Sequence, residues 1–145
     1  MVELILIEQP QPADAKPSAG EGEVFLLGDS NDVNRIIEPW DLTDNNYRAF
    51  LSGGEEVELI ESEGVCPHKI GPLRWTTRTQ IVRADNEVLG DASNYVADSI
   101  RHRLRAFYGH DEKELRDVSL AVLIEMALAV TADLYDRATP TISSI

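Results

Sequence analysis

Cys66-Pro67-His68 is the one Cys/His cluster in this chain, and it is the first place where chemistry would be expected. A catalytic cysteine needs a base that orients and deprotonates it, and a structural zinc site needs four ligands. The other histidines, His102 and His110, are not at a ligand spacing from this pair. We therefore expect no metal site, and we interpret the cluster as a loop with a buried thiol and a solvated imidazole.

Glu125 is a second candidate, because it is the single charged residue in an apolar stretch from Ser119 to Val130. A buried carboxylate must be paired, hydrogen-bonded or protonated, so Glu125 could serve as a catalytic acid. More often such a residue pairs with an arginine of a neighbouring helix or faces a partner subunit. We interpret Glu125 as an interface residue.

Three arginines, Arg101, Arg103 and Arg105, form a basic cluster in an otherwise acidic chain. Arg101 and Arg105 share a helix face, with Asp98 one turn before Arg101. Two interpretations stay open. The arginines could form ion pairs within the chain, with Asp98, Glu112 and Glu114, or they could form an interface with an acidic neighbour such as another copy of the chain.

The sequence contains no glycine-rich phosphate loop, no Ser/His/Asp arrangement and no paired-carboxylate motif in a recognisable context. These are the residue patterns that phosphate binding, nucleophilic catalysis and general acid–base catalysis require. We therefore expect no catalytic residues, no cofactor and no enzymatic activity.

The composition is acidic and poor in lysine: three Lys and ten Arg stand against 26 Asp and Glu, which gives a formal net charge of -13. Such a surface suits a salty cytoplasm, where carboxylates hold water and ions and salt screens their repulsion. A GC-rich genome is the other explanation for the low lysine content. The acidity argues against direct nucleic-acid binding, because phosphate neutralisation requires Lys and Arg.

The single cysteine excludes an internal disulfide framework and fits a reducing compartment. The N-terminus lacks the basic region of a signal peptide, and the apolar stretch from Ser119 to Val130 is shorter than the roughly 20 residues of a membrane span. We expect neither signal-peptide secretion nor a membrane partner.

The elements that position these residues predict one α+β domain over residues 1–145. Apolar and alternating segments favour a small, mostly antiparallel sheet from residues 1–90, with strands over 2–8, 23–27, 57–62 and 73–83. Asp85-Asn86 is interpreted as a hairpin turn before a returning strand over 87–89. Short helices are expected after the N-caps at 29–31 and after Thr43, the second with Tyr47, Phe50 and Leu51 facing inward.

Residues 91–138 are predicted to be helical and to pack on the sheet. Apolar residues recur every four positions from Val96 to Tyr108, and Gly109 supplies the C-terminal stop. Asp111 and Glu114 match a capping box that opens a long apolar helix ending near Arg137. Residues 9–22 are read as a proline-rich loop or arm, and residues 139–145 as an uncharged tail.

An acid-rich turn at 85–87 precedes a helix that closes in Phe107-Tyr108-Gly109, and the following apolar helix ends in Leu134-Tyr135-Asp136-Arg137. In these features residues 83–139 resemble the head–tail connector (adaptor) proteins of tailed viruses. The resemblance implies a ring subunit between portal and tail, with other copies and neighbouring assembly proteins as partners. Tyr135 and Ile145 are then expected at interfaces.

A second set of residues, comprising 26–30, Trp75, Arg78 and 84–87, resembles chorismate lyase and the related effector-binding domains. In that family an arginine on a strand grips a substrate carboxylate, and Arg78 is at the matching place. The family carries a glutamate on a C-terminal strand, where this chain is helical. The resemblance therefore implies a ligand-binding derivative.

Together these features favour a non-enzymatic structural subunit, a neck or tail component of a tailed virus of a halophilic host, located in the virion or the cytoplasm. The alternative is a small-carboxylate-binding or lyase-like domain that uses Arg78. A third hypothesis is an acidic mimic that inhibits a nucleic-acid-binding protein.

Overall fold

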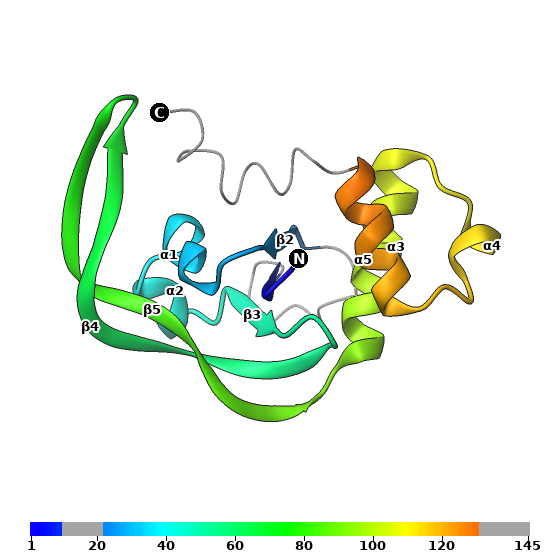
Figure 1. Cartoon of the computed structure of the whole chain (residues 1–145), viewed down its shortest axis with the longest axis horizontal. Coiled ribbons are helices and arrows are strands. Elements are labelled where there is room, and N and C mark those ends of the chain that lie inside the picture. The colour runs from blue at the N-terminus through cyan, green and yellow to red at the C-terminus, as the bar shows by residue number, and fades with distance from the viewer. Residues whose placement is uncertain (10–21, 131–145) are drawn as a thin grey trace.

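Five strands form one antiparallel sheet in the order β2-β1-β3-β4-β5 in the computed structural model, which describes residues 1–9 and 22–130 (Figure 1). The strands are β1 (Leu4–Glu8), β2 (Val24–Leu27), β3 (Tyr47–Phe50), β4 (Glu55–Gly71) and β5 (Arg74–Asp91). Leu4 to Ile7 of β1 are buried without alternation. A strand reads as a continuous apolar run when both faces of its sheet are covered, and this is the case here.

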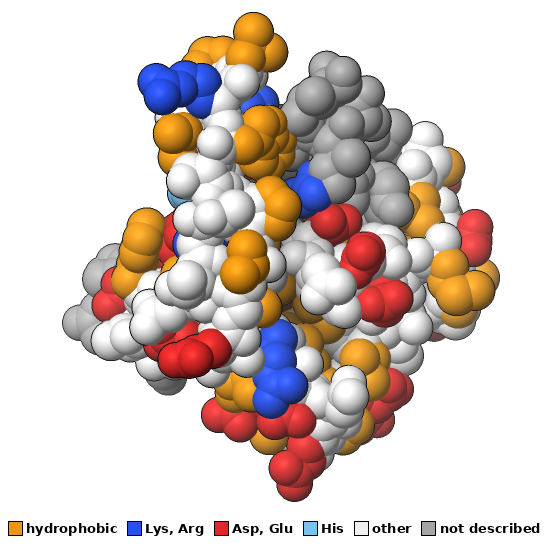
Figure 2. Space-filling model, turned by 60° about the vertical axis from the view of Figure 1, so that its left-hand side comes forward, with side chains coloured by type: hydrophobic (Ala, Val, Ile, Leu, Met, Phe, Trp, Pro, Cys, Tyr) orange, Lys and Arg blue, Asp and Glu red, His pale blue; other side chains and the backbone are white. Residues whose placement is uncertain are grey.

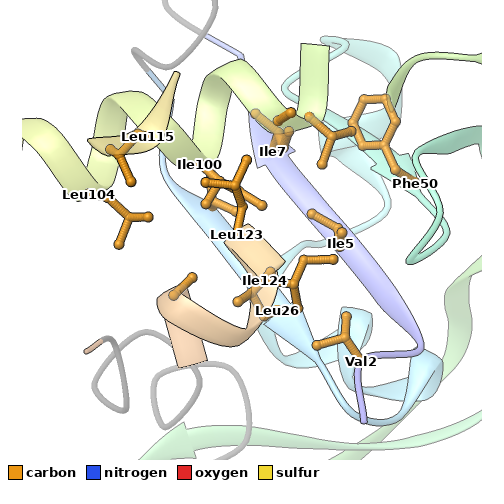
Figure 3. Close-up of a cluster of buried hydrophobic side chains, with 14 residues drawn as sticks. Val2, Ile5, Ile7, Leu26, Phe50, Ile100, Leu104, Leu115, Leu123 and Ile124 are labelled. Atoms are coloured by element: carbon orange, nitrogen blue, oxygen red, sulfur yellow. The ribbon is translucent and has the colours of Figure 1, made fainter. Parts of the chain in front are cut away.

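Helices cover both faces of the short half of the sheet. One face carries η1 (Ser30–Asp32), α1 (Val33–Ile36) and α2 (Trp40–Thr43); the other carries α3 (Ser93–Tyr108), α4 (Glu112–Leu115) and α5 (Leu120–Val130). Figure 3 shows the second core, in which Ile5 and Ile7 of β1 meet Ile100 of α3 and Leu123 of α5. Burying each such side chain stabilises the fold by about 1.5–3 kcal/mol.

The hairpin of β4 and β5 extends far beyond the rest of the sheet and curves around α1 (Figure 1). Its strands pair from Glu55 opposite Asp91 to Gly71 opposite Arg74, but β3 pairs with β4 only at Val57 and Glu56. Most of the hairpin is therefore a two-stranded ribbon. A register shift follows Glu63, which pairs with Gln80. We call residues 64–79 the distal hairpin, and residues 55–63 with 80–91 the hairpin base.

The α+β class and the antiparallel sheet are confirmed, whereas two local predictions are wrong. Residues 47–50 form β3 rather than a helix, because they pair with β1 on one side and with β4 on the other. The hairpin turn is at Pro72-Leu73, and β5 continues through Asp85-Asn86 to Asp91. The proposed returning strand over 87–89 is the end of the same strand.

The C-terminal helices differ from the prediction as well. The first matches, since α3 ends at Gly109 with a positive φ of 72° that favours glycine. The capping residue Asp111 accepts a hydrogen bond from the amide of Lys113, but it opens only the four residues of α4. The apolar helix begins at Leu120, so a long helix from residue 111 is not confirmed. Residues 131–145, as well as 10–21 of the predicted arm, are outside the described residues.

Candidate functional site

The distal hairpin exposes large apolar side chains near its turn. Beside the turn, Leu73 is 88% exposed and Ile70 is 55% exposed, whereas Val65, which is 73% exposed, lies next to Cys66 at the level of Arg78. A two-stranded hairpin is marginally stable at best by itself in water, and clustered exposed apolar side chains mark contact sites with other proteins. Figure 2 shows hydrophobic and basic side chains together on the projecting upper lobe. This end of the hairpin is the leading candidate for a protein interface.

Charge is separated along the hairpin. The distal hairpin contains Lys69, Arg74 and Arg78 and no acidic residue, although the chain has a net charge of -13. The hairpin base contains Arg83 and eight acidic residues, namely Glu55, Glu56, Glu58, Glu61, Glu63, Asp85, Glu87 and Asp91. The two ends of one ribbon therefore carry opposite charge.

The two cations nearest the turn are not used in ion pairs within the described part of the chain. The ammonium of Lys69 lies 6.0 Å from the centre of the Trp75 ring. The side chain of Arg74 is exposed and forms no ion pair or hydrogen bond with residues 1–9 or 22–130. Both are therefore available to an acidic partner.

Arg78, the predicted carboxylate-binding residue, joins the distal hairpin to the body. Its side chain is only 14% exposed, and its guanidinium pairs with the carboxylate of Glu38. Nη2 of Arg78 also donates to the main-chain oxygen of Asn34 at 2.8 Å and to its side-chain oxygen at 3.2 Å. These contacts engage both terminal nitrogens of the guanidinium with groups of the same chain, whereas its buried Nε has no hydrogen-bond partner among the described residues. Binding of a free carboxylate by Arg78 stays a prediction.

Asn34 completes this joint by binding the backbone of β5. Its amide nitrogen donates to the carbonyl of Val82 at 2.9 Å, and its side-chain oxygen accepts from the amide of Val82 at 2.7 Å. The side chain thus replaces a neighbouring strand at one point of the open sheet edge, which would otherwise invite pairing with another chain. The hairpin is therefore fixed to α1 at Arg78 and Val82 of β5, and the turn of the hairpin lies beyond these contacts.

The Cys66/His68 cluster lies on β4 of the distal hairpin rather than in a loop. Nδ1 of His68 is 3.3 Å from Oε1 of Glu38, whose Oε2 contacts Arg78, and Cys66 is a half-buried free thiol. A cleft of about 290 Å³ separates α1 from the hairpin here, and its lining includes Trp75 but not Arg78. Within the described residues, no group of three or more His, Cys, Asp or Glu side chains could hold a metal ion.

The predicted interface arginines of α3 have internal partners. Arg101 donates to the carbonyls of Leu115 at 2.9 Å and Val118 at 2.8 Å, and it pairs with Asp98 at 2.9 Å. The guanidinium of Arg103 lies 4.5 Å from the centre of the Phe107 ring.

Arg105 differs from Arg101 because its one ion pair with another described residue is exposed, with Glu112 at 3.6 Å. The intramolecular interpretation therefore accounts for Arg101, which holds the connection between α4 and α5. A contact with a neighbouring chain through Arg105 stays a prediction.

Glu125 is exposed on α5, so the premise that it is a buried carboxylate is wrong. The buried side of this helix consists of Leu123, Ile124 and Ala127, and Glu125 points away from them. An interface role for Glu125 stays a prediction. Tyr135 and Ile145 are outside the described residues.

A hollow of about 260 Å³ lies beside the hairpin base. It is lined by Leu42, Val57 and Leu89 together with the acidic residues Glu56 and Glu58. Glu56 is held by Arg48 through two hydrogen bonds of 2.8 and 2.9 Å, and its contact raises the pKa of Arg48. Glu58 is exposed and pairs with no cation among the described residues.

Tyr47 lines the same hollow. Burial, together with nearby carboxylates of which Glu8 is the strongest, raises the pKa of Tyr47 to about 12. The phenol is therefore neutral at ordinary pH. The hollow has apolar walls, and because Arg48 also lines it and pairs with Glu56, Glu58 is the lining carboxylate left without a cation among the described residues.

The sequence prediction missed Lys69, Leu73 and Arg74. A signal for them was present: between Glu63 and Asp85 this acid-rich chain contains no acidic residue. Within the described residues, none of the helices is long and apolar enough to span a membrane. No protein-family model, curated protein or solved structure matches the chain, so its function is inferred from the residues described above.

Proposed function

We propose that the protein is a non-enzymatic assembly subunit that functions as an oligomer, as a neck or tail component of a tailed virus of a halophilic host. The observation that carries this proposal is the distal hairpin, whose end exposes Leu73 and Ile70 beyond the contact of Arg78 with Asn34. A ribbon of this length needs another surface to cover its apolar end.

The remaining residues support an assembly role over catalysis. Arg78, Arg101 and His68, which carry the functional groups most useful for binding or catalysis, make contacts that hold elements of the fold together. Salt of multimolar concentration strengthens apolar association while it screens surface charge. An apolar hairpin end is therefore suited to assembly in a halophilic host.

Light scattering in multimolar salt tests the proposal. We expect the wild-type chain to form oligomers and the double variant Ile70→Ser, Leu73→Ser to remain monomeric with the same far-ultraviolet circular dichroism. The matched control is Trp40→Ser, which removes a 63% exposed apolar side chain from α2 and should leave the mass unchanged. A wild-type chain that stays monomeric at every concentration, and also beside the other proteins of the particle, would contradict the proposal.

A small-carboxylate-binding domain is the second candidate, and the cleft beside Trp75 favours it. Arg35 and Lys69 are among its lining residues and could attract an anion, although Arg78 is not. The chain has two tryptophans, so Trp75 should be followed in a Trp40→Phe background. Titration with small carboxylates that leaves the Trp75 fluorescence unchanged would remove this candidate.

A further inference from the structure

We infer that the distal hairpin of one copy binds the hollow at the hairpin base of a second copy. This inference rests on the proposed function and names the partner, which is a second copy of this chain. The two copies use different surfaces: the distal hairpin of one contacts the hairpin base of the other. Such a contact is heterologous, and its repetition generates a ring when the rotation between copies closes.

The apolar parts of the two surfaces correspond. On the distal hairpin, Leu73 and Ile70 project beside the turn. At the hairpin base, Val88 is 50% exposed and Leu89 is 59% exposed, and Leu89 belongs to the wall of the 260 Å³ hollow. A leucine at the end of a narrow ribbon can enter such a hollow, and the aliphatic walls would bury it.

The charged parts correspond as well. Lys69 and Arg74 flank the exposed apolar residues of the distal hairpin, whereas Glu58 and Glu87 flank those of the base. None of these four side chains has an ion pair with another described residue. Opposite charges around an apolar centre fix the register of an interface and exclude wrong partners.

The same residues argue against contact between two identical ends. Two distal hairpins placed together would bring Lys69 and Arg74 of each copy against one another, and two bases would bring Glu58 and Glu87 of each copy against one another. Like-charge contact across an interface is costly. The end of one hairpin and the base of the next are the combination in which both the apolar and the charged groups find partners.

Charge reversal with complementation tests the inference. The distal variant is Lys69→Glu with Arg74→Glu, and the base variant is Glu58→Lys with Glu87→Lys. Each variant alone should self-associate about a hundredfold more weakly than the wild type, because like charges then meet at the contact. An equimolar mixture should regain wild-type association, because the reversed hairpin of one variant meets the reversed base of the other.

The control is Lys113→Glu with Arg116→Glu, which lowers the net charge by as much as the distal variant does, at exposed positions on and beside α4. It should associate as the wild type does, and circular dichroism should show that all variants fold. The masses are measured by light scattering and sedimentation, at low salt and at high salt.

The possible results separate this inference from the proposed function. If the wild type forms oligomers but neither reversal weakens them, or if the mixture fails to regain association, the contact is elsewhere and the inference is wrong while the assembly role stands. If the wild type never associates, the proposed function fails and the inference fails with it.

Discussion

Replacement of Arg78 by alanine should loosen the hairpin from the body and lower the free energy of unfolding by about 2–4 kcal/mol. The estimate follows from its contacts. The guanidinium loses a carboxylate partner, Glu38, and two acceptors of Asn34, and a hydrogen bond to a charged group contributes about 1.5–3 kcal/mol. The side chain of Glu38 is 22% exposed, so the loss of unfolding free energy should be smaller than for a fully buried ion-pair network.

The assay is equilibrium unfolding by denaturant, combined with hydrogen exchange of the amides of β4 and β5. Arg83→Ala is the matched control, because Arg83 is exposed on the same strand and makes no ion pair with residues 1–9 or 22–130. It should change the stability by less than about 0.5 kcal/mol. For a chain of this size each kcal/mol corresponds to about 3 °C in Tm.

Unchanged unfolding and unchanged exchange in Arg78→Ala would refute this reasoning, since the contacts would then contribute nothing. A variant with wild-type stability that had instead lost binding of a small carboxylate would favour the ligand-binding alternative. The measurement therefore distinguishes a structural role of Arg78 from a ligand-binding role.

Two further predictions follow from the geometry. Arg101→Ala should lower the free energy of unfolding by about 2–3 kcal/mol in denaturant titrations, because two backbone carbonyls lose their donor, whereas Arg105→Ala removes an exposed ion pair and should cost less than about 1 kcal/mol. Equal effects would contradict the assignment of a bracing role to Arg101 alone. Because the pKa of Tyr47 is about 12 in the folded chain and about 10 when unfolded, the unfolded state loses this proton first, and the stability contributed below pH ~10 should fall as the pH rises toward 12. Unfolding curves over this range should fall less steeply for Tyr47→Phe, and identical slopes would contradict the prediction.

The sequence predicted the elements whose signal is local. The apolar runs of β1 and β2 and the four-residue spacing of α3 with Gly109 at its end depend on neighbouring residues alone. By contrast, Tyr47, Phe50 and Leu51 have the spacing of a helix face, yet pairing with β1 makes a strand of residues 47–50. Pairing between distant segments overrides a weak local preference.

The long hairpin and the broken C-terminal helix depend on distant contacts too. Strands commonly have about 3–10 residues, so a turn at Asp85-Asn86 was the natural reading of the sequence, whereas β5 has 18. The helix expected from residue 111 is interrupted after Leu115, where Arg101 of α3 binds the carbonyls of the connection. The sequence pattern of residues 111–130 contains no information about an arginine on another helix, so the break in the helix could not be predicted from it.

In this lysine-poor, acidic chain, two of the few cations, Lys69 and Arg74, lie beside the turn of the distal hairpin. Excess carboxylate over most of the chain keeps copies apart, and at about 1 M salt the screening length is roughly 3 Å, so charges act only where they touch. Under these conditions Lys69 and Arg74 cannot steer two copies together over a distance. They can still select the register once Leu73 reaches an apolar surface, because contact excludes the screening ions. In the proposed contact, the distal hairpin would combine an apolar attraction that salt strengthens with charged groups that act only where the two copies touch.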